Sequence, residues 1–129
     1  IFFIGNDMSS HIFPFGRSGI KNVYEFGQGV DPGMVLFLLW FIIGPGEEIF
    51  WRGYIHKSLA RKYGKIGTGI AILAYAGVHI ASGNMMLIVA ALVGGVFWGL
   101  LYHYYKNLWV NIISHAFWDA AVFVLWPFN

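Results

Sequence analysis

The stretch Glu47-Glu48-Ile49-Phe50-Trp51-Arg52 places two adjacent carboxylates and an arginine inside one of the most apolar parts of the sequence. The preceding run from Met34 to Ile43 contains no charged side chain. An ionised side chain in hydrocarbon costs several kcal/mol, so such residues usually face a protein interior or a water-filled cavity. The stretch therefore predicts either a structural ion-pair cluster or a functional site inside a membrane protein.

The composition supports a membrane location. Of the 129 residues, 58% are apolar, 19% are aromatic and 11% are charged, whereas a soluble domain carries about a quarter charged residues. The chain has no cysteine, which excludes a disulfide framework and a thiol nucleophile. A net charge of +2 without a basic stripe gives no nucleic-acid-binding signature. We expect an all-α, polytopic transmembrane bundle.

The hydrophobic pattern predicts about four core spans, one of them kinked. Asp31-Pro32 is an N-cap followed by proline at the first helical position, and the first span should end near Tyr63-Gly64. Within it, Gly44-Pro45-Gly46 predicts a kink that opens a pocket beside the carboxylates. The other three spans are expected at about 66–82, 85–105 and 108–126.

Domain organisation and orientation follow from the same pattern. Residues 1–31 are expected to form a loop or interfacial segment, with the end of a preceding helix as an alternative for its start, and residues 32–129 the core. Four of the eight Lys and Arg residues lie between positions 57 and 65. By the positive-inside rule this turn is cytoplasmic. The prediction is a multi-pass integral protein of the cytoplasmic membrane, with Gly95-x-x-x-Gly99 as a helix-packing face.

Polar residues of three different spans should meet at one depth. With a rise of about 1.5 Å per residue, Glu47 lies about 15 Å from the inner end of its span and His79 about 20 Å from its own. His115 and Asp119 lie about 12 and 18 Å deep on the last span. These last two are four residues apart and share a helix face.

A second pair can form within the first span. Glu48 and Arg52 are also four residues apart, so an ion pair along the helix is possible. A buried ionic cluster that only fixes helix register is the structural alternative. For ionisable residues inside a membrane, function is the default interpretation.

The residue types narrow the chemistry. The sequence has no His-Glu-x-x-His pair, and Ser114 cannot face its neighbour His115. A carboxylate with histidines suits activation of a water molecule, and a second histidine with a polar neighbour can stabilise an oxyanion. Alternatively Glu47, Glu48, His79 and His115 could form a zinc site, since hydrolytic zinc sites use His and Glu.

Three motifs in order resemble one family. Glu47-Glu48-x-x-x-Arg52, then Tyr75-x-x-x-His79, then His115-x-x-x-Asp119 are similar to the motifs of the CPBP family. This is the CAAX protease and bacteriocin-processing (ABI) family, which includes the Ras-converting CAAX endopeptidase. The resemblance covers about residues 33–126. It implies an all-helical intramembrane bundle and a glutamic intramembrane endopeptidase without a cofactor.

The resemblance also implies roles for individual residues. Glu47 matches the family's catalytic base, which activates water together with His79. His115 and Asp119 match the pair that stabilises the oxyanion. In the family the last position is usually Asn. An ionised Asp119 would repel an oxyanion, so Asp119 could donate a hydrogen bond to the oxyanion only when protonated. Otherwise its role would be to orient His115.

The remaining motif residues have supporting roles in this interpretation. Glu48 and Arg52 would orient the site. Tyr75 stands where the family usually has phenylalanine, and its added hydroxyl needs a hydrogen-bond partner.

The predicted function is therefore hydrolysis of a peptide bond by glutamate- and histidine-activated water. Its partners would be membrane lipids and a peptide or lipidated-peptide substrate of the prenylated CAAX or bacteriocin type, with no nucleic acid. Two alternatives stay open. One is a metal-dependent membrane peptidase, and the other is a non-catalytic membrane immunity or binding protein.

Overall fold

The computed structural model describes residues 16–25 and 28–125, and all regular structure within them is helical. Segments η1, η2 and η4 are π-helical and η3 is a 3₁₀ turn. In chain order the elements are α2 (Gly16–Glu25), α3 (Pro32–Leu38), η1 (Leu39–Ile43), α4 (Gly44–Glu48), η2 (Ile49–His56), α5 (Lys57–Val78), η3 (His79–Ser82), α6 (Met85–Tyr105), α7 (Leu108–Ala120) and η4 (Ala121–Leu125).

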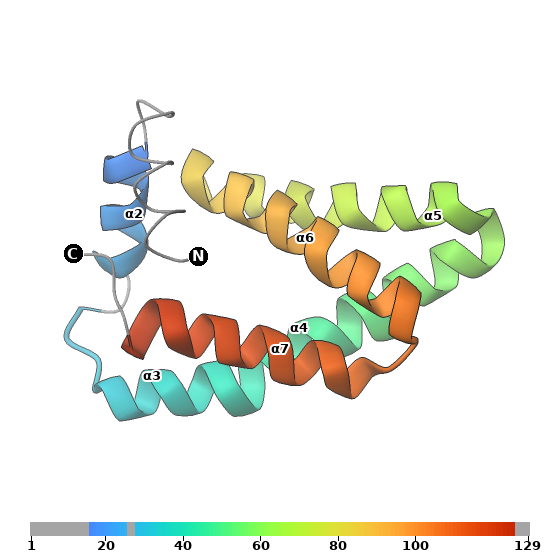
Figure 1. Cartoon of the computed structure of the whole chain (residues 1–129). Helices are drawn as coiled ribbons and strands as arrows, with labels where there is room; N and C mark the ends of the chain where they lie inside the picture. Colours follow the sequence, from blue (N-terminus) through green and yellow to red (C-terminus); the bar gives the residue numbers. More distant parts are fainter. Residues whose placement is uncertain (1–15, 26–27, 126–129) are drawn as a thin grey trace.

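Three helical runs in the described residues are long and apolar enough to cross a membrane: Pro32–Ser82, Met85–Tyr105 and Leu108–Leu125. The first run doubles back at Gly64, where φ is 60° and ψ is −135°, as Figure 1 shows. Its two arms correspond to the first two predicted spans. The prediction of an all-α transmembrane bundle with one kinked helix is confirmed, and the chain is an integral membrane protein.

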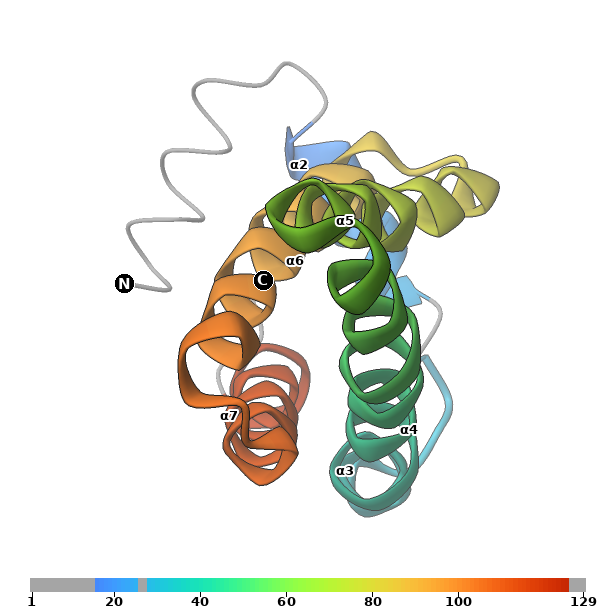
Figure 2. The same ribbon diagram turned by 90° about the vertical axis from the view of Figure 1, so that its right-hand side faces the viewer.

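The helices form an arch, with α7 in one leg and α3 and α4 in the other (Figure 2). Viewed along the bundle (Figure 2), α7 faces the arm made of α3 and α4, while α5 and α6 lie together above them. The turn at Gly64 and the turn at Lys106 lie at the same end of the bundle (Figure 1). We call residues 57–65 and 103–107 the basic end. Five of the chain's eight Lys and Arg residues are in it.

Side-chain caps fix where the spans begin. Asp31 accepts a hydrogen bond from the backbone N–H of Met34 at 3.0 Å, as its N-cap position predicts. Asn84 caps α6, and Asn107 caps α7. Each cap satisfies backbone N–H groups that a helix start leaves without an intrahelical partner. The short turns between the spans therefore hold α6 and α7 as antiparallel neighbours of the elements before them.

The predicted break at Gly44-Pro45-Gly46 has a different form from the expected one. Helical backbone continues through it, and the π-helical segment η1 directly precedes it, with the Gly44 N–H bonded to the carbonyl of Leu39. A Cβ on Gly44 would lie 3.3 Å from the Cα and Cβ of Ala116. This glycine thus allows close contact with α7. A Cβ on Gly46 would meet no atom within 4 Å, so the close packing is confined to Gly44 and the expected pocket beside the carboxylates stays a prediction.

Helix α2 lies where the sequence predicts a loop, and this is a second correction. Asn84 donates from Nδ2 to the Gly19 carbonyl at 2.8 Å. The Tyr24 hydroxyl donates to the Val122 carbonyl at 2.7 Å. These contacts to distant elements stabilise a segment whose glycines disfavour a helix on their own. The alternative that the chain starts in the end of a preceding helix lies outside the described residues.

The Gly95–Gly99 packing face is confirmed. A Cβ on Gly95 would lie 3.0 Å from Cδ1 of Tyr75, and a Cβ on Gly99 would lie 3.0 Å from Cγ1 of Ile72. Both glycines are buried. Since contacts of this length are tighter than ordinary van der Waals packing, α6 can approach α5 only because these side chains are missing.

We expect Gly95→Leu to destabilise the protein by about 1–3 kcal/mol, the usual cost of overpacking a filled interior. The measurement is the free energy of unfolding in mixed micelles. Gly69→Leu is the matched control, because a Cβ at Gly69 would meet no atom within 4 Å. Equal losses in the two variants would contradict the packing role.

Candidate active site

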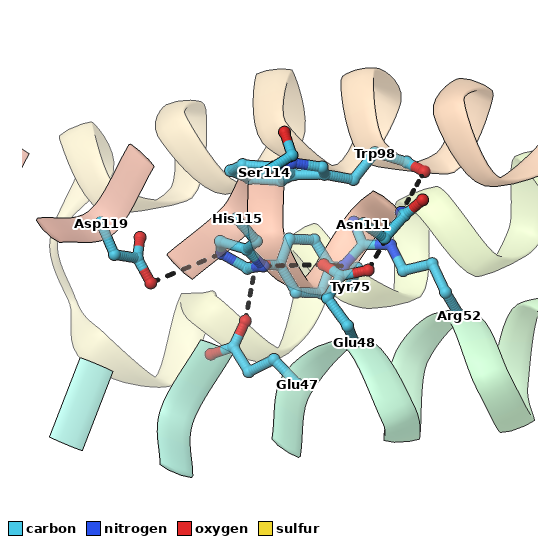
Figure 3. Close-up of polar contacts among 9 residues, drawn as sticks. All are labelled: Glu47, Glu48, Arg52, Tyr75, Trp98, Asn111, Ser114, His115 and Asp119. Carbon is cyan, nitrogen blue, oxygen red and sulfur yellow. Dashed lines mark hydrogen bonds and ion pairs between the residues drawn. The ribbon is translucent and has the colours of Figure 1, made fainter. Parts of the chain in front are cut away.

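Glu48 is the centre of a buried hydrogen-bond network (Figure 3). Its side chain is fully buried. One oxygen, Oε1, accepts from Nη1 of Arg52 at 2.8 Å and from Nδ1 of His115 at 2.7 Å. The other, Oε2, accepts from Nδ2 of Asn111 at 3.1 Å. Burial of a charge is tolerated when it is paired and its remaining lone pairs are satisfied, so these three donors explain how Glu48 can lie inside the bundle.

Asn111 is a site residue that the sequence interpretation missed. It is fully buried and donates both to Glu48 and to the Trp98 carbonyl, the latter at 2.8 Å. Its Oδ1 atom has no hydrogen-bond partner among the described residues. Asn111 lies four residues before His115 and thus on the same helix face. That spacing is the signal that could have identified it.

Trp98 supports the histidine of this network. Its ring stacks on His115 with 3.8 Å between ring centroids and 22° between the planes. Its indole N–H donates to Oγ of Ser114 at 3.2 Å. Ser114 therefore accepts a hydrogen bond from Trp98 and does not form a catalytic triad with His115. We call Glu48, Arg52, Asn111 and His115 the Glu48 group.

Glu47 points to a different partner. Its Oε2 accepts from the Tyr75 hydroxyl at 2.8 Å, which supplies the partner that this hydroxyl needs. The guanidinium carbon of Arg52 lies 4.4 Å from the centre of the Tyr75 ring, a cation–π distance. Arg52 thus donates a hydrogen bond to Glu48, and the face of its guanidinium group lies over the ring of Tyr75, which donates to Glu47. Arg52 therefore connects the surroundings of the two carboxylates.

His79 completes this second set, which we call the Glu47 group (Glu47, Tyr75 and His79). Nδ1 of His79 lies 2.8 Å from the Tyr75 carbonyl oxygen. A carbonyl only accepts, so Nδ1 donates and the neutral ring carries its lone pair on Nε2. The rings of His79 and Tyr75 are 5.1 Å apart. Glu47 and His79 are both half-buried, unlike the enclosed Glu48.

Asp119 lies at the far side of His115. Its Oδ2 is 3.7 Å from Nε2 of His115, which is an ion-pair distance and too long for a hydrogen bond. The histidine therefore stands between two carboxylates, with its Nδ1 held by Glu48. Asp119 is buried, with 7% of its surface exposed.

The residues expected at one depth lie close together in the structure, in the two groups described above. His79 lies against the partner of Glu47, whereas His115 is bonded to Glu48. The expected ion pair between Glu48 and Arg52 is present at 2.8 Å. The alternative zinc site at Glu47, Glu48, His79 and His115 is not formed, because no three His, Cys, Asp or Glu side chains of residues 16–25 and 28–125 converge on one point.

Comparison with known proteins gives one match. The model of the family described as "Type II CAAX prenyl endopeptidase Rce1-like" matches residues 30–121. This range covers more than two thirds of the chain and includes every member of the Glu47 and Glu48 groups. Searches of curated proteins and of solved structures give no significant match.

Proposed function

This chain belongs to the Rce1-like family of type II CAAX prenyl endopeptidases, a family of intramembrane proteases, and from that premise we propose that Glu47 and His79 activate the water that hydrolyses a peptide bond. The observation that carries the proposal is the half-buried Glu47 carboxylate beside a histidine whose Nδ1 is fixed by the Tyr75 carbonyl. A general base must be able to reach its water.

The contrast between the two carboxylates favours Glu47 as the base. Glu48 is fully buried and accepts from three donors, so none of its oxygens is directed to a substrate. Within the described residues Glu47 accepts one hydrogen bond, from the Tyr75 hydroxyl, and its side chain is only half-buried. Its other oxygen can accept a proton from water. In this proposal Glu48 and Arg52 are positioning residues.

The reaction proceeds in two steps in this scheme. Water attacks the carbonyl carbon of the peptide bond as Glu47 takes its proton, and Nε2 of His79 accepts the second water hydrogen as a hydrogen bond that orients the attack. The tetrahedral intermediate then breaks at its C–N bond. Glu47 returns the proton to the departing amine, which restores the base.

In this proposal His115 stabilises the oxyanion of that intermediate. Its Nδ1 donates to Glu48, so Nε2 is the atom that would donate to the oxyanion. Donation from both nitrogens requires the doubly protonated ring, and the two flanking carboxylates, Glu48 and Asp119, would pair with it. In this arrangement Asp119 orients His115.

The substrate and the orientation complete the proposal. The family description supports a peptide with a prenylated CAAX end, and a bacteriocin-type peptide is the second substrate to test. In this proposal residues 32–129 form the protease core, with the basic end on the cytoplasmic side by the positive-inside rule. The direct test is cleavage of both peptides by the purified full chain in proteoliposomes, with and without a metal chelator. Hydrolysis that survives chelation supports the metal-free reaction.

We expect His79→Gln to lower kcat about 10²–10⁴-fold, the usual contribution of a positioned acid–base group, because the flexible glutamine side chain does not hold an acceptor at the position of the imidazole Nε2. The measurement is single-turnover cleavage in the same vesicles. His103→Gln is the control, since His103 belongs to neither group and lies near the basic end. A wild-type cleavage rate in His79→Gln would show that His79 takes no part in the reaction.

A further inference from the structure

A cavity of about 480 Å³ opens at the basic end, between the start of α5 and the end of α6. Its lining is cationic at the rim and aromatic at the floor. The lining residues are His56, Lys57, Ala60, Arg61, Tyr102 and Lys106. None of them belongs to the Glu47 or Glu48 group, so the cavity has its own lining residues.

The charge of this cavity is not balanced locally. The sequence has no acidic residue between Glu48 and Asp119. Within the described residues, no ion pair is formed by Lys57, Arg61 or Lys106. All three side chains are exposed. Three cations around one hollow without a carboxylate create a positive potential that attracts an anion.

The floor of the cavity is built from buried side chains. His56 and Tyr102 are only 2% and 8% exposed. Nε2 of His56 lies 3.2 Å from the Thr68 hydroxyl, and its ring packs edge-on against Tyr102. Lys106 adopts a left-handed conformation with φ 52°, and its N–H donates to the Tyr102 carbonyl at 2.9 Å. The floor of the hollow is therefore held in place by contacts within the protein.

The surrounding aromatic residues place the cavity at the level of lipid headgroups. Tyr104 and Tyr105 are 84% and 66% exposed and follow directly after the cavity residue Tyr102. On the other side of the turn, Tyr63 is 47% exposed. Exposed tyrosines at the ends of spans are typical of the membrane–water interface. A ligand at this depth is most readily supplied by the bilayer itself.

We propose that the basic cavity binds the phosphate headgroup of an anionic phospholipid. Lys57 and Arg61, one turn apart on α5, face Lys106 at the end of α6 across the hollow. Arginine and lysine are the side chains that bind phosphate oxygens with charge-assisted hydrogen bonds, and basic pockets between transmembrane helices suit lipid headgroups. The acyl chains would lie along the exposed apolar surface of the same helices.

The test is thermal unfolding of the purified full chain in neutral detergent with added phosphatidylglycerol or phosphatidylcholine. We expect phosphatidylglycerol to raise Tm and phosphatidylcholine to have no comparable effect. In the double variant Arg61→Gln/Lys106→Gln, the phosphatidylglycerol concentration for the half-maximal shift should rise about 30-fold, since two cations near an anionic lipid are lost.

The matched control is Lys62→Gln/Lys65→Gln, which removes the same charge from the basic end but from side chains outside the cavity lining. Its half-maximal concentration should stay within about threefold of wild type, because cations at a distance act only through screened attraction. All four side chains are exposed, so both variants should keep the lipid-free Tm. If lipid binding weakened equally in both variants, general surface charge and not the cavity would attract the lipid. That result would overturn the proposal.

Two further arms distinguish the source of the anion. Inorganic phosphate alone, and a short peptide with a free C-terminal carboxylate, are added at matched concentrations. A Tm rise with either of them that equals the rise with phosphatidylglycerol would assign the cavity to a free anion or to a peptide end, and would overturn the lipid proposal.

Discussion

Glu47→Gln should abolish peptide cleavage while the protein still folds and inserts into the membrane. Glutamine has nearly the shape of glutamate and can keep a hydrogen bond with the Tyr75 hydroxyl, so the local packing survives. It cannot take a proton from water, however. We expect kcat to fall by at least about 10²–10⁴-fold, the contribution of general base catalysis. The measurement is cleavage of a prenylated CAAX peptide in proteoliposomes, normalised to folded protein.

Tyr75→Phe is the control for this variant. It removes the hydrogen bond to Glu47 but keeps the ring that Arg52 contacts, and phenylalanine is the residue that the family resemblance leads one to expect here. Cleavage should persist in Tyr75→Phe. If Glu47→Gln kept its activity and a folded Glu48→Gln lost it, the general base would be Glu48 and not Glu47.

Glu48→Ala should have the largest effect on stability of any single substitution in the site. It removes the acceptor of three hydrogen bonds and leaves the Arg52 guanidinium, which is 2% exposed, without its carboxylate. Breaking one half of a buried ion pair costs about 3–5 kcal/mol. We expect a loss of this size in the free energy of unfolding, measured by denaturant titration in mixed micelles.

A double-mutant cycle separates the ion pair from simple loss of packing. In Glu48→Ala/Arg52→Leu neither charge remains, so the second substitution should recover part of the loss and give a coupling energy of about 1–3 kcal/mol. Arg52→Leu alone should also be destabilising, because it leaves a buried carboxylate with one donor fewer. Additive effects, or a loss below about 1 kcal/mol for Glu48→Ala, would contradict a structural role for this pair.

Most of the fold could be predicted because its signals are local. Apolar runs separated by Gly83-Asn84 and Lys106-Asn107 define the last three spans, and the asparagines do cap the helices that follow. The reversal at Gly64 agrees with the predicted end of the first span near Tyr63-Gly64. The Glu48–Arg52 ion pair follows from helical spacing alone. Each of these features depends on residues that are close in the sequence.

The missed features depend on contacts between distant elements. Glu47 and Glu48 are adjacent, so they differ by about 100° around a helix, and only the packed bundle determines which one faces Tyr75 and which one His115. Asn111 carries no charge and did not stand out in an apolar helix. The fold of α2 depends on Asn84 and thus on a partner 65 residues away.

The two π-helical segments that flank the carboxylates have a consequence for how this helix can vary. A π turn holds one residue more than the α turn it replaces, so η1 and η2 each shift the phase of everything that follows them. Deleting one residue from η1 would rotate Glu47 and Glu48 by about 100° relative to α3, and each carboxylate would lose its own neighbour. The number of residues in η1 therefore determines that Glu47 contacts Tyr75 of α5 and that Glu48 contacts His115 of α7. We therefore expect a one-residue deletion in η1 to disturb the site more than a substitution within η1 does.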